Sequence, residues 1–444
     1  MGAWLSWPGI LRLGLVQTAL GAIVVLTTST MNRVIVVEWS LPAMLPGALV
    51  GLHYAVQLLR PRFGYGSDVA GRRTPWVLGG MVVLALGGFL AAVATAWMGT
   101  QVVPGILLAT VAFLLIGAGV GASGTSLLAL LAKRVSPQRR AAAAALVWLM
   151  MIVGFIVTAG VAGHFLDPFS AQRLVIVAAV VCVGAVLLTI VALWGMEADM
   201  AGTAPADSAQ PSASEAARLP FRQALRQVWE EPQARLFTAF VFVSMLAYSM
   251  QDLILEPFAG IVFGLTPGQS TQLSGLQHSG VLAGMLVVGF FCSVIGGPRL
   301  GSLRFWTLSG CVLSALALVN LVMAALTGPP WPLHASVFLL GLANGAFAVS
   351  AIGSMMDLAG QGQAQREGTR MGLWGAAQAI AFGLGGFLGT LGVDVVRALV
   401  GSPVPAYAAV FTAQAGLFLW AMRLMASLGR TGEGERAPSA ALKV

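Results

Sequence analysis

Long apolar stretches, separated by short polar loops, run through almost the whole sequence. Each contains about 20 apolar residues, which is enough for an α-helix to cross the hydrocarbon core of a bilayer. We expect twelve of them, beginning near Leu11, Leu41, Thr74, Pro104, Ala141, Arg173, Gln233, Ser270, Leu303, Trp331, Thr369 and Pro403. The pattern predicts an all-α integral membrane protein with twelve transmembrane helices.

A segment rich in small residues, Pro and Ser, AGTAPADSAQPSASEAA, separates the sixth stretch from the seventh. This composition is typical of a flexible linker. The chain is therefore expected to have four parts: an N-terminal six-helix half at 1–196, a cytoplasmic linker at 197–232, a C-terminal six-helix half at 233–428 and a disordered cytoplasmic tail at 429–444.

The composition supports a membrane protein, because 58% of the residues are hydrophobic and only 9% are charged, against about 25% charged in soluble domains. The net charge of +8 is spread over short loops, which indicates membrane topology rather than binding to nucleic acid. Of the Lys and Arg residues, only Arg33, Arg173 and Arg397 lie on one side of the predicted membrane, and the others lie on the opposite side. Since basic residues accumulate on the cytoplasmic side, both termini are predicted to be cytoplasmic.

The two halves also repeat one another. A shift of 225 lays Pro42 on Pro267 and His53 on His278, and further pairs are Gly64 with Gly289, Gly71 with Gly296 and, at a shift of 226, Trp148 with Trp374 and Arg140 with Arg366. Parallel repeats of this kind are the architecture of the major facilitator superfamily, with a central cavity between pseudo-symmetric halves. We expect that fold.

The loop after the second stretch carries the motif GYGSDVAGRR, with Gly64, Asp68, Gly71, Arg72 and Arg73. It resembles the signature loop of that superfamily between helices 2 and 3. The glycines permit a tight turn, and the aspartate can cap a helix or pair with an arginine. Val69 stands where the superfamily usually has a basic residue. The alternative is an ordinary solvated basic turn.

Three further stretches narrow the resemblance: TSTMNRVIVVEWSLP at 28–42, MQDLILEPFAG at 250–260 and GLWGAAQAIAFGLGGFLG at 372–389. Together they resemble the PucC/LhaA family, the bacteriochlorophyll delivery branch of the superfamily. The resemblance runs from Leu11 to about Arg397, and the length and the stretch LHYAVQLLRPRFGYGSD resemble one subgroup of the family.

The resemblance implies a non-catalytic accessory protein of the bacterial inner, photosynthetic intracytoplasmic, membrane. Such a protein handles or delivers bacteriochlorophyll during its late biosynthesis and during light-harvesting or reaction-centre assembly. The implied partners are bacteriochlorophyll and lipid, the light-harvesting or reaction-centre apoproteins, and the bacteriochlorophyll synthase, with no nucleic acid. No cofactor is assigned, and bacteriochlorophyll is the implied cargo.

Asp252 and Glu256 are acidic residues in an otherwise apolar run, and their spacing places both on one side of a helix. A charged residue within a membrane span costs roughly 2.5 to 3.5 kcal/mol, so a partner or a function is expected. The repeat places Arg33 near the position of Glu256. We predict that Arg33 pairs with these acids and, with Asn32 and Gln251, closes an outer gate. The alternatives are acids that face headgroups and water, or a proton relay.

His53 and His278 fall near the middle of helices 2 and 8. A neutral imidazole is a good axial ligand for the magnesium of a chlorin, and Gln57 and Gln277 lie close by in sequence. The four residues are candidates for pigment binding. The alternative is that both histidines make helix-packing hydrogen bonds.

Asn344 and Gln378 are intramembrane amides that are candidates for lining the central cavity. Asp357 is expected near the cytoplasmic end of the tenth helix. It is predicted to form a latch there with Lys133 and Arg366.

Two other functions remain open. A membrane prenyltransferase would need aspartate-rich clusters that hold magnesium diphosphate, and only Asp252 and Glu256 imitate one. A secondary transporter of a small amphipathic solute would share the fold and differ in cargo.

Overall fold

The computed structural model describes residues 4–59, 73–136, 139–196, 226, 229–297, 300–361 and 367–434, and all regular structure within them is helical. The N-terminal group of helices contains α1 Trp7–Val25, α2 Met31–Arg33, α3 Met44–Gln57, α5 Thr74–Met98, α6 Val102–Arg134, α7 Arg140–Leu166 and α8 Ala171–Leu193. Two π-helical segments, η1 Leu26–Thr30 and η2 Val34–Glu38, flank α2.

The C-terminal group contains α11 Pro232–Met250, α12 Leu255–Phe263, α13 Pro267–Phe290 with the π-helical segment η5 Phe291–Ile295, α14 Leu303–Thr327, α15 Leu333–Gln361, α16 Glu367–Val400 and α17 Pro403–Gly434. In the described part of the chain, 11 helical spans are long and apolar enough to cross a membrane. The prediction of an all-helical membrane protein is confirmed. The second predicted helix is represented by α3, whose 14 residues cover only about 21 Å at 1.5 Å per residue.

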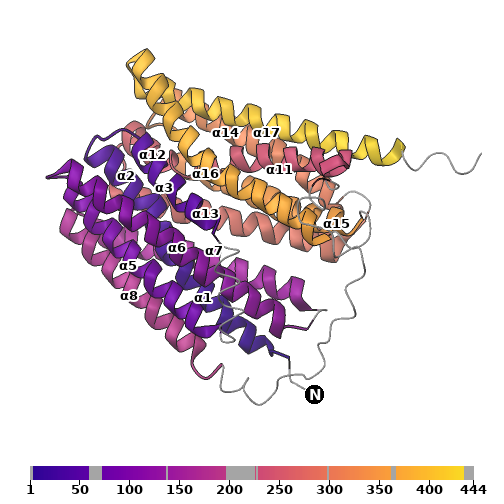
Figure 1. Cartoon of the computed structure of the whole chain (residues 1–444). Coiled ribbons are helices and arrows are strands. Elements are labelled where there is room, and N and C mark those ends of the chain that lie inside the picture. The colour runs from indigo at the N-terminus through magenta and orange to yellow at the C-terminus, as the bar shows by residue number, and fades with distance from the viewer. Residues whose placement is uncertain are drawn as a thin grey trace, which may run out of the picture.

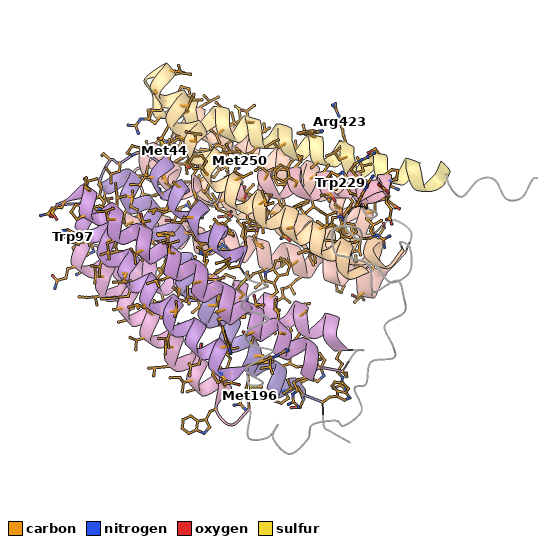
Figure 2. All side chains as sticks on the ribbon, in the orientation of Figure 1. Met44, Trp97, Met196, Trp229, Met250 and Arg423 are labelled. Carbon is orange, nitrogen blue, oxygen red and sulfur yellow. The ribbon has the colours of Figure 1, made fainter. Side chains whose placement is uncertain are left out.

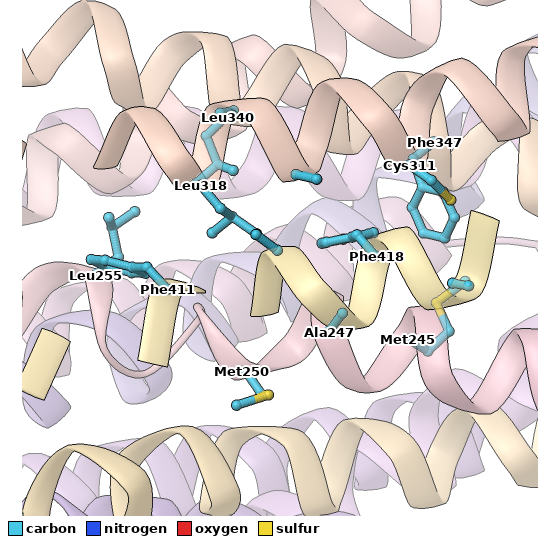
Figure 3. Close-up of a cluster of buried hydrophobic side chains, with 14 of the residues drawn as sticks. Met245, Ala247, Met250, Leu255, Cys311, Leu318, Leu340, Phe347, Phe411 and Phe418 are labelled. Atoms are coloured by element: carbon cyan, nitrogen blue, oxygen red, sulfur yellow. The ribbon is translucent and has the colours of Figure 1, made fainter. Parts of the chain in front are cut away.

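Each group has its own hydrophobic core. One cluster of buried side chains comes from residues 10–196, joined by Leu253. The other comes from residues 237–428, joined by Ile152. Figure 3 shows part of the second cluster, in which the ring of Phe418 in α17 packs against that of Phe347 in α15. The helices therefore pack into two bodies, which are indigo to magenta and orange to yellow in Figure 1.

Glycines set the closest helix crossings. A Cβ atom at Gly284 of α13 would lie 2.1 Å from the carbonyl oxygen of Leu342 in α15, and one at Gly345 of α15 would lie 2.0 Å from that of Val281 in α13. Small residues allow such backbone contact between membrane helices, where packing rather than water exclusion drives association. These positions therefore fix the spacing of α13 and α15.

The two groups meet through α7 with α13 and through α3 with α16. They come together at the end of the bundle that carries Glu38, Asp167, Thr266 and Asp394, which we call the junction end. Figure 1 shows α2, α3 and α12 at this end. The groups diverge toward the other end, where Met196 and Trp229 lie on separate bodies in Figure 2.

The end of the last helix differs from the prediction, and part of the signature loop lies outside the described residues. Helix α17 continues to Gly434, six residues into the segment 429–444 that the sequence analysis predicts as a disordered tail, and the four-part division stays a prediction. In the signature loop, Gly64, Asp68, Gly71 and Arg72 lie outside the described residues, while Arg73 directly precedes α5. Most of the predicted linker and residues 435–444 also lie outside them.

Candidate functional site

The stretch from Met250 to Gly260 is a break in a membrane span. Helix α11 ends at Met250, a turn follows, and α12 begins at Leu255. Pro257 has no N–H, so the carbonyl of Leu253 has no helical donor. The side-chain amide of Asn32 replaces that donor, since its Nδ2 donates to the Leu253 oxygen at 2.5 Å. A proline in one helix group thus creates the acceptor for an asparagine in the other.

The helix break gives Asp252 and Glu256 different surroundings. Asp252 is in the turn and exposed, whereas Glu256 is in α12 and only 2% exposed. The prediction that both carboxylates share one helix face is therefore wrong, because the helix on which the spacing argument rests is interrupted between them.

The first membrane span, which faces this break, is also irregular there. The π-helical segments η1 and η2 lie on either side of Asn32 and Arg33. A π-helical turn widens the helix by closing i to i+5 bonds, and such turns are frequent at functional sites. Both residues are buried against the C-terminal group, with Arg33 only 3% exposed.

Arg33 does not form the predicted ion pair with Asp252 or Glu256. Its Nη1 pairs with Glu38 instead, and its Nη2 donates to the carbonyl oxygen of Leu265 at 2.6 Å. The π-helical turn explains the difference, because it brings the residue five positions later back over Arg33. The arginine still links the two groups, through a backbone carbonyl rather than a carboxylate.

A buried polar cluster surrounds Glu256. Ser29 and Ser274 share a hydrogen bond of 2.9 Å across the groups, and Thr30 and Thr271 share another of 2.9 Å. The hydroxyls of Ser29, Ser270 and Ser274 lie near the Glu256 carboxylate. None of them has hydrogen-bond geometry to it, and both of its oxygens lack a partner among the described residues.

Gln251 adds to this polar layer. It is fully buried, and neither its amide oxygen nor its amide nitrogen has a hydrogen-bond partner within the described structure. All five predicted gate residues thus lie where α2 and η2 approach α12 and the break before it: Asn32, Arg33, Gln251, Asp252 and Glu256. Their function as a gate stays a prediction.

Two aspartates that the sequence reasoning missed also join the groups. Asp394 of α16 accepts hydrogen bonds from the backbone nitrogens of Ala43, at 3.1 Å, and Met44, at 2.7 Å, at the start of α3. Asp167 follows α7 and accepts from Thr266 Oγ1 at 2.7 Å and from the Gly268 nitrogen at 3.2 Å, at the start of α13. A carboxylate at a helix N-terminus is stabilised by the free N–H groups and the helix dipole.

Their positions in the sequence differ by 227 (394 minus 167), close to the repeat shifts of 225 and 226. Comparing acidic residues at the ends of equivalent helices would have found both. Beside Asp167 lies an open recess of about 560 Å³, lined by Arg33, Glu38, Phe169 and Gly264 among others.

The two histidines have different surroundings. His278 Nδ1 lies 2.8 Å from the carbonyl oxygen of Ser274, and its ring packs edge-on against Phe155 of the other group at 4.8 Å. A ring nitrogen that faces a carbonyl must carry the proton, which leaves the Nε2 lone pair of the neutral ring available to a metal. His53 Nε2 is instead 2.7 Å from Gln57 Nε2. His278 is therefore the better candidate ligand.

The remaining amides are used in different ways. Asn344 is fully buried and accepts a hydrogen bond of 2.9 Å from Ser314, so it joins α14 to α15. Gln277 is buried and Gln378 is half-buried. Lining of a cavity by these residues stays a prediction.

The predicted inner latch of Lys133, Asp357 and Arg366 stays a prediction, because its side chains are not among those described. Arg366 and the side chains of Lys133 and Asp357 lie outside the described part. Near this end, Arg370 instead forms an ion pair of 2.7 Å with Glu231. No cluster of three or more His, Cys, Asp or Glu side chains suited to a metal ion occurs among the described residues.

Comparison with known proteins decides the family. The model of the family described as PUCC protein matches residues 30–432. The chain belongs to this family. The expectation drawn from residues 28–42, 250–260 and 372–389 is confirmed.

Relatives agree with this assignment. The chain is 52% identical over 435 residues to the bacteriochlorophyll synthase 44.5 kDa chain of Rhodobacter capsulatus, with 98% of each chain covered. It is 30% identical to the protein PucC of the same organism, with 95% of this chain and 92% of that protein covered.

Among solved structures, a bacterial homologue of the human lysosomal transporter Spinster, in an inward-facing and unoccupied conformation, matches with a TM-score of 0.66 at 15% identity. The match covers 97% of this chain and 98% of that one. At this identity the likeness shows the fold alone, so the chain folds like that transporter.

Proposed function

We propose that the chain is a non-catalytic accessory protein of the photosynthetic membrane that handles or delivers bacteriochlorophyll. It acts during late bacteriochlorophyll biosynthesis and the assembly of light-harvesting or reaction-centre complexes. The observation that carries this proposal is the 52% identity, over 98% of both chains, to a protein named for bacteriochlorophyll synthesis.

The proposed architecture has twelve transmembrane helices in two pseudo-symmetric halves, with both termini and the linker in the cytoplasm. The 11 spans, together with α3 as the twelfth helix, support this count. The three arginines predicted to lie outside, Arg33, Arg173 and Arg397, all fall toward the junction end. That end then faces outward, and the two halves are closed there and spread toward the cytoplasm.

The proposed pigment site uses His278 as the ligand to the pigment magnesium. The proton on Nδ1 is held by the Ser274 carbonyl, and Phe155 holds the ring from the opposite half. The residue that orients an imidazole commonly fixes which nitrogen binds a metal. Apoproteins, lipid and the synthase are the proposed partners.

The word synthase in the relative's name raises the question of catalysis. A prenyl transfer site needs carboxylates that hold magnesium diphosphate together. Asp252 and Glu256 point into different surroundings, one exposed and one buried. This separation supports a partner of the synthase rather than the enzyme itself.

Deletion of the gene in its photosynthetic host tests the proposal. We expect bacteriochlorophyll to be made but the light-harvesting or reaction-centre bands to fall, with recovery when the gene is restored. Accumulation of the precursor that lacks the isoprenoid tail would indicate an enzyme instead. Unchanged bands and unchanged pigment would overturn the proposal.

Secondary transport of a small amphipathic solute is the second candidate, favoured by the fold likeness to the Spinster homologue. Ion-driven uptake of such a solute into vesicles containing the purified protein, with no bound pigment, would support it.

A further inference from the structure

The carboxylate of Glu256 is buried without a partner at the contact between the helix groups. It is 2% exposed, and neither oxygen has a hydrogen bond within the described structure. An ionised carboxylate in this position loses its hydration without gaining a hydrogen bond or an ion pair, which costs several kcal/mol. A bare Glu256 anion is therefore incompatible with the closed junction.

Arg33 supplies the missing positive charge only in part, because it acts on Glu256 from beyond ion-pair distance. Two of its guanidinium nitrogens are held by Glu38 and by the Leu265 carbonyl, and it makes no ion pair with Glu256. On the other elements packed against α12, the titratable side chains on this part of the bundle are Glu38 on η2, which pairs with Arg33, His278 on α13 and Tyr407 on α17. Arg423 of α17 lies 16 residues beyond Tyr407, about 24 Å further along the helix. Asp252 lies in the preceding turn and carries a charge of the wrong sign.

The groups nearest the carboxylate offer oxygen atoms. Ser29 comes from η1, and Ser270 and Ser274 come from α13, so both helix groups contribute. Ser29 and Ser274 are hydrogen-bonded to each other, and Ser270 donates to the Pro267 carbonyl. A shell of one carboxylate and several hydroxyl oxygens suits a small hard cation.

We propose that Glu256 binds a monovalent cation, a proton or a sodium ion, and that this binding holds the two helix groups together at the junction end. The cation neutralises the carboxylate and lets it stay buried. When the cation leaves, the anion draws in water and the groups separate. The site is independent of the pigment cargo, so either proposal can fail without the other.

The experiment follows the junction with spin labels at two exposed positions, Trp97 on the N-terminal group and Val400 on the C-terminal group. The full chain, with its three cysteines replaced, is reconstituted in nanodiscs. In sodium-free buffer we expect the short distance at low pH and a longer distance at high pH, because the carboxylate loses its proton as the pH rises. If sodium also binds, adding it at high pH restores the short distance while choline does not.

Glu256→Gln imitates the cation-loaded side chain, since it is neutral and has nearly the same shape. We expect it to keep the short distance at every pH and sodium concentration. Glu230→Gln, which neutralises an exposed acid paired with Arg226 away from the junction, is the control and should titrate as the wild type does. Ser274→Ala should shift the midpoint, because it removes one oxygen of the shell.

Difference infrared spectroscopy adds a readout that does not depend on movement. A carboxylic acid C=O band that forms on acidification and is missing in Glu256→Gln identifies the proton as the cation. The proposal is overturned if Glu256→Gln titrates like the wild type, if the titration disappears in Asp252→Asn instead, or if the wild-type distance responds to neither pH nor sodium.

Discussion

Asp167 and Asp394 make the same contact in opposite directions. Each lies near the end of a helix in one group and accepts hydrogen bonds at the first residues of a helix in the other group. Asp167 joins α7 to α13, and Asp394 joins α16 to α3. The internal repeat thus produces two related helix caps, one on each side of the buried cluster around Glu256.

The caps lead to a prediction about opening. Asp167→Asn and Asp394→Asn each remove the charge at a helix N-terminus, which contributes about 1 kcal/mol. We expect each change to shift the ratio of closed to open junction about fivefold toward open, and the double variant to shift it by the product. Spin-label distances between the groups measure the ratio. Glu230→Gln, at an exposed acid paired with Arg226, should leave it unchanged, and equal effects of all three variants would contradict the account.

Asn32 and Pro257 form a test pair. Asn32→Leu leaves the buried Leu253 carbonyl without a donor, and we expect a loss of about 1–3 kcal/mol in stability. Adding Pro257→Ala restores an N–H at the position that can reach that carbonyl, so part of the loss should return. Thermal unfolding in detergent measures both steps. If the second change makes the protein less stable in the Asn32→Leu background, the carbonyl argument is wrong.

The crossing of α13 and α15 depends on the absence of side chains. Gly284→Val places atoms against the Leu342 carbonyl, and we expect a loss of stability of about 3 kcal/mol. Gly289 on the same helix has open space around it, so Gly289→Val is the matched control and should cost little. Equal thermal stability of the two variants would show that the helices do not depend on this contact.

The histidines are predicted to differ in pigment binding. His278→Phe removes the ring whose Nε2 is available to a metal, so we expect at least tenfold weaker bacteriochlorophyll binding. His53→Phe should have a smaller effect, because its Nε2 already lies against Gln57. Absorbance titration of the purified variants measures both. The reverse order of effects would assign the ligand to His53, and no effect of either would remove histidine ligation.

The sequence predicted where most helices begin, because apolar length alone specifies a membrane span. Predicted starts such as Thr74, Leu303 and Pro403 coincide with those in the structure. The gate residues could be placed near one another by the repeat and the topology. The predicted ion pair between Arg33 and Glu256 is not formed, because the prediction assumed a regular helix around each of the two residues.

Two local irregularities explain the difference. The π-helical turns around Arg33 bring Glu38 within reach, and hydropathy carries no signal for an extra residue in a turn. Pro257 is a helix-breaking residue whose signal the sequence analysis did not use. The hydrogen bond from Asn32 to the Leu253 carbonyl also depends on how two distant spans cross. Long-range contacts of this kind require the three-dimensional structure.

The absorption spectrum of the protein purified from a bacteriochlorophyll-producing host tests the central proposal most directly. We expect a bacteriochlorophyll band that stays with the protein through purification and is weakened in His278→Phe. A protein that carries no pigment from that host, and binds none when bacteriochlorophyll is added to it in nanodiscs, would contradict a function in pigment handling.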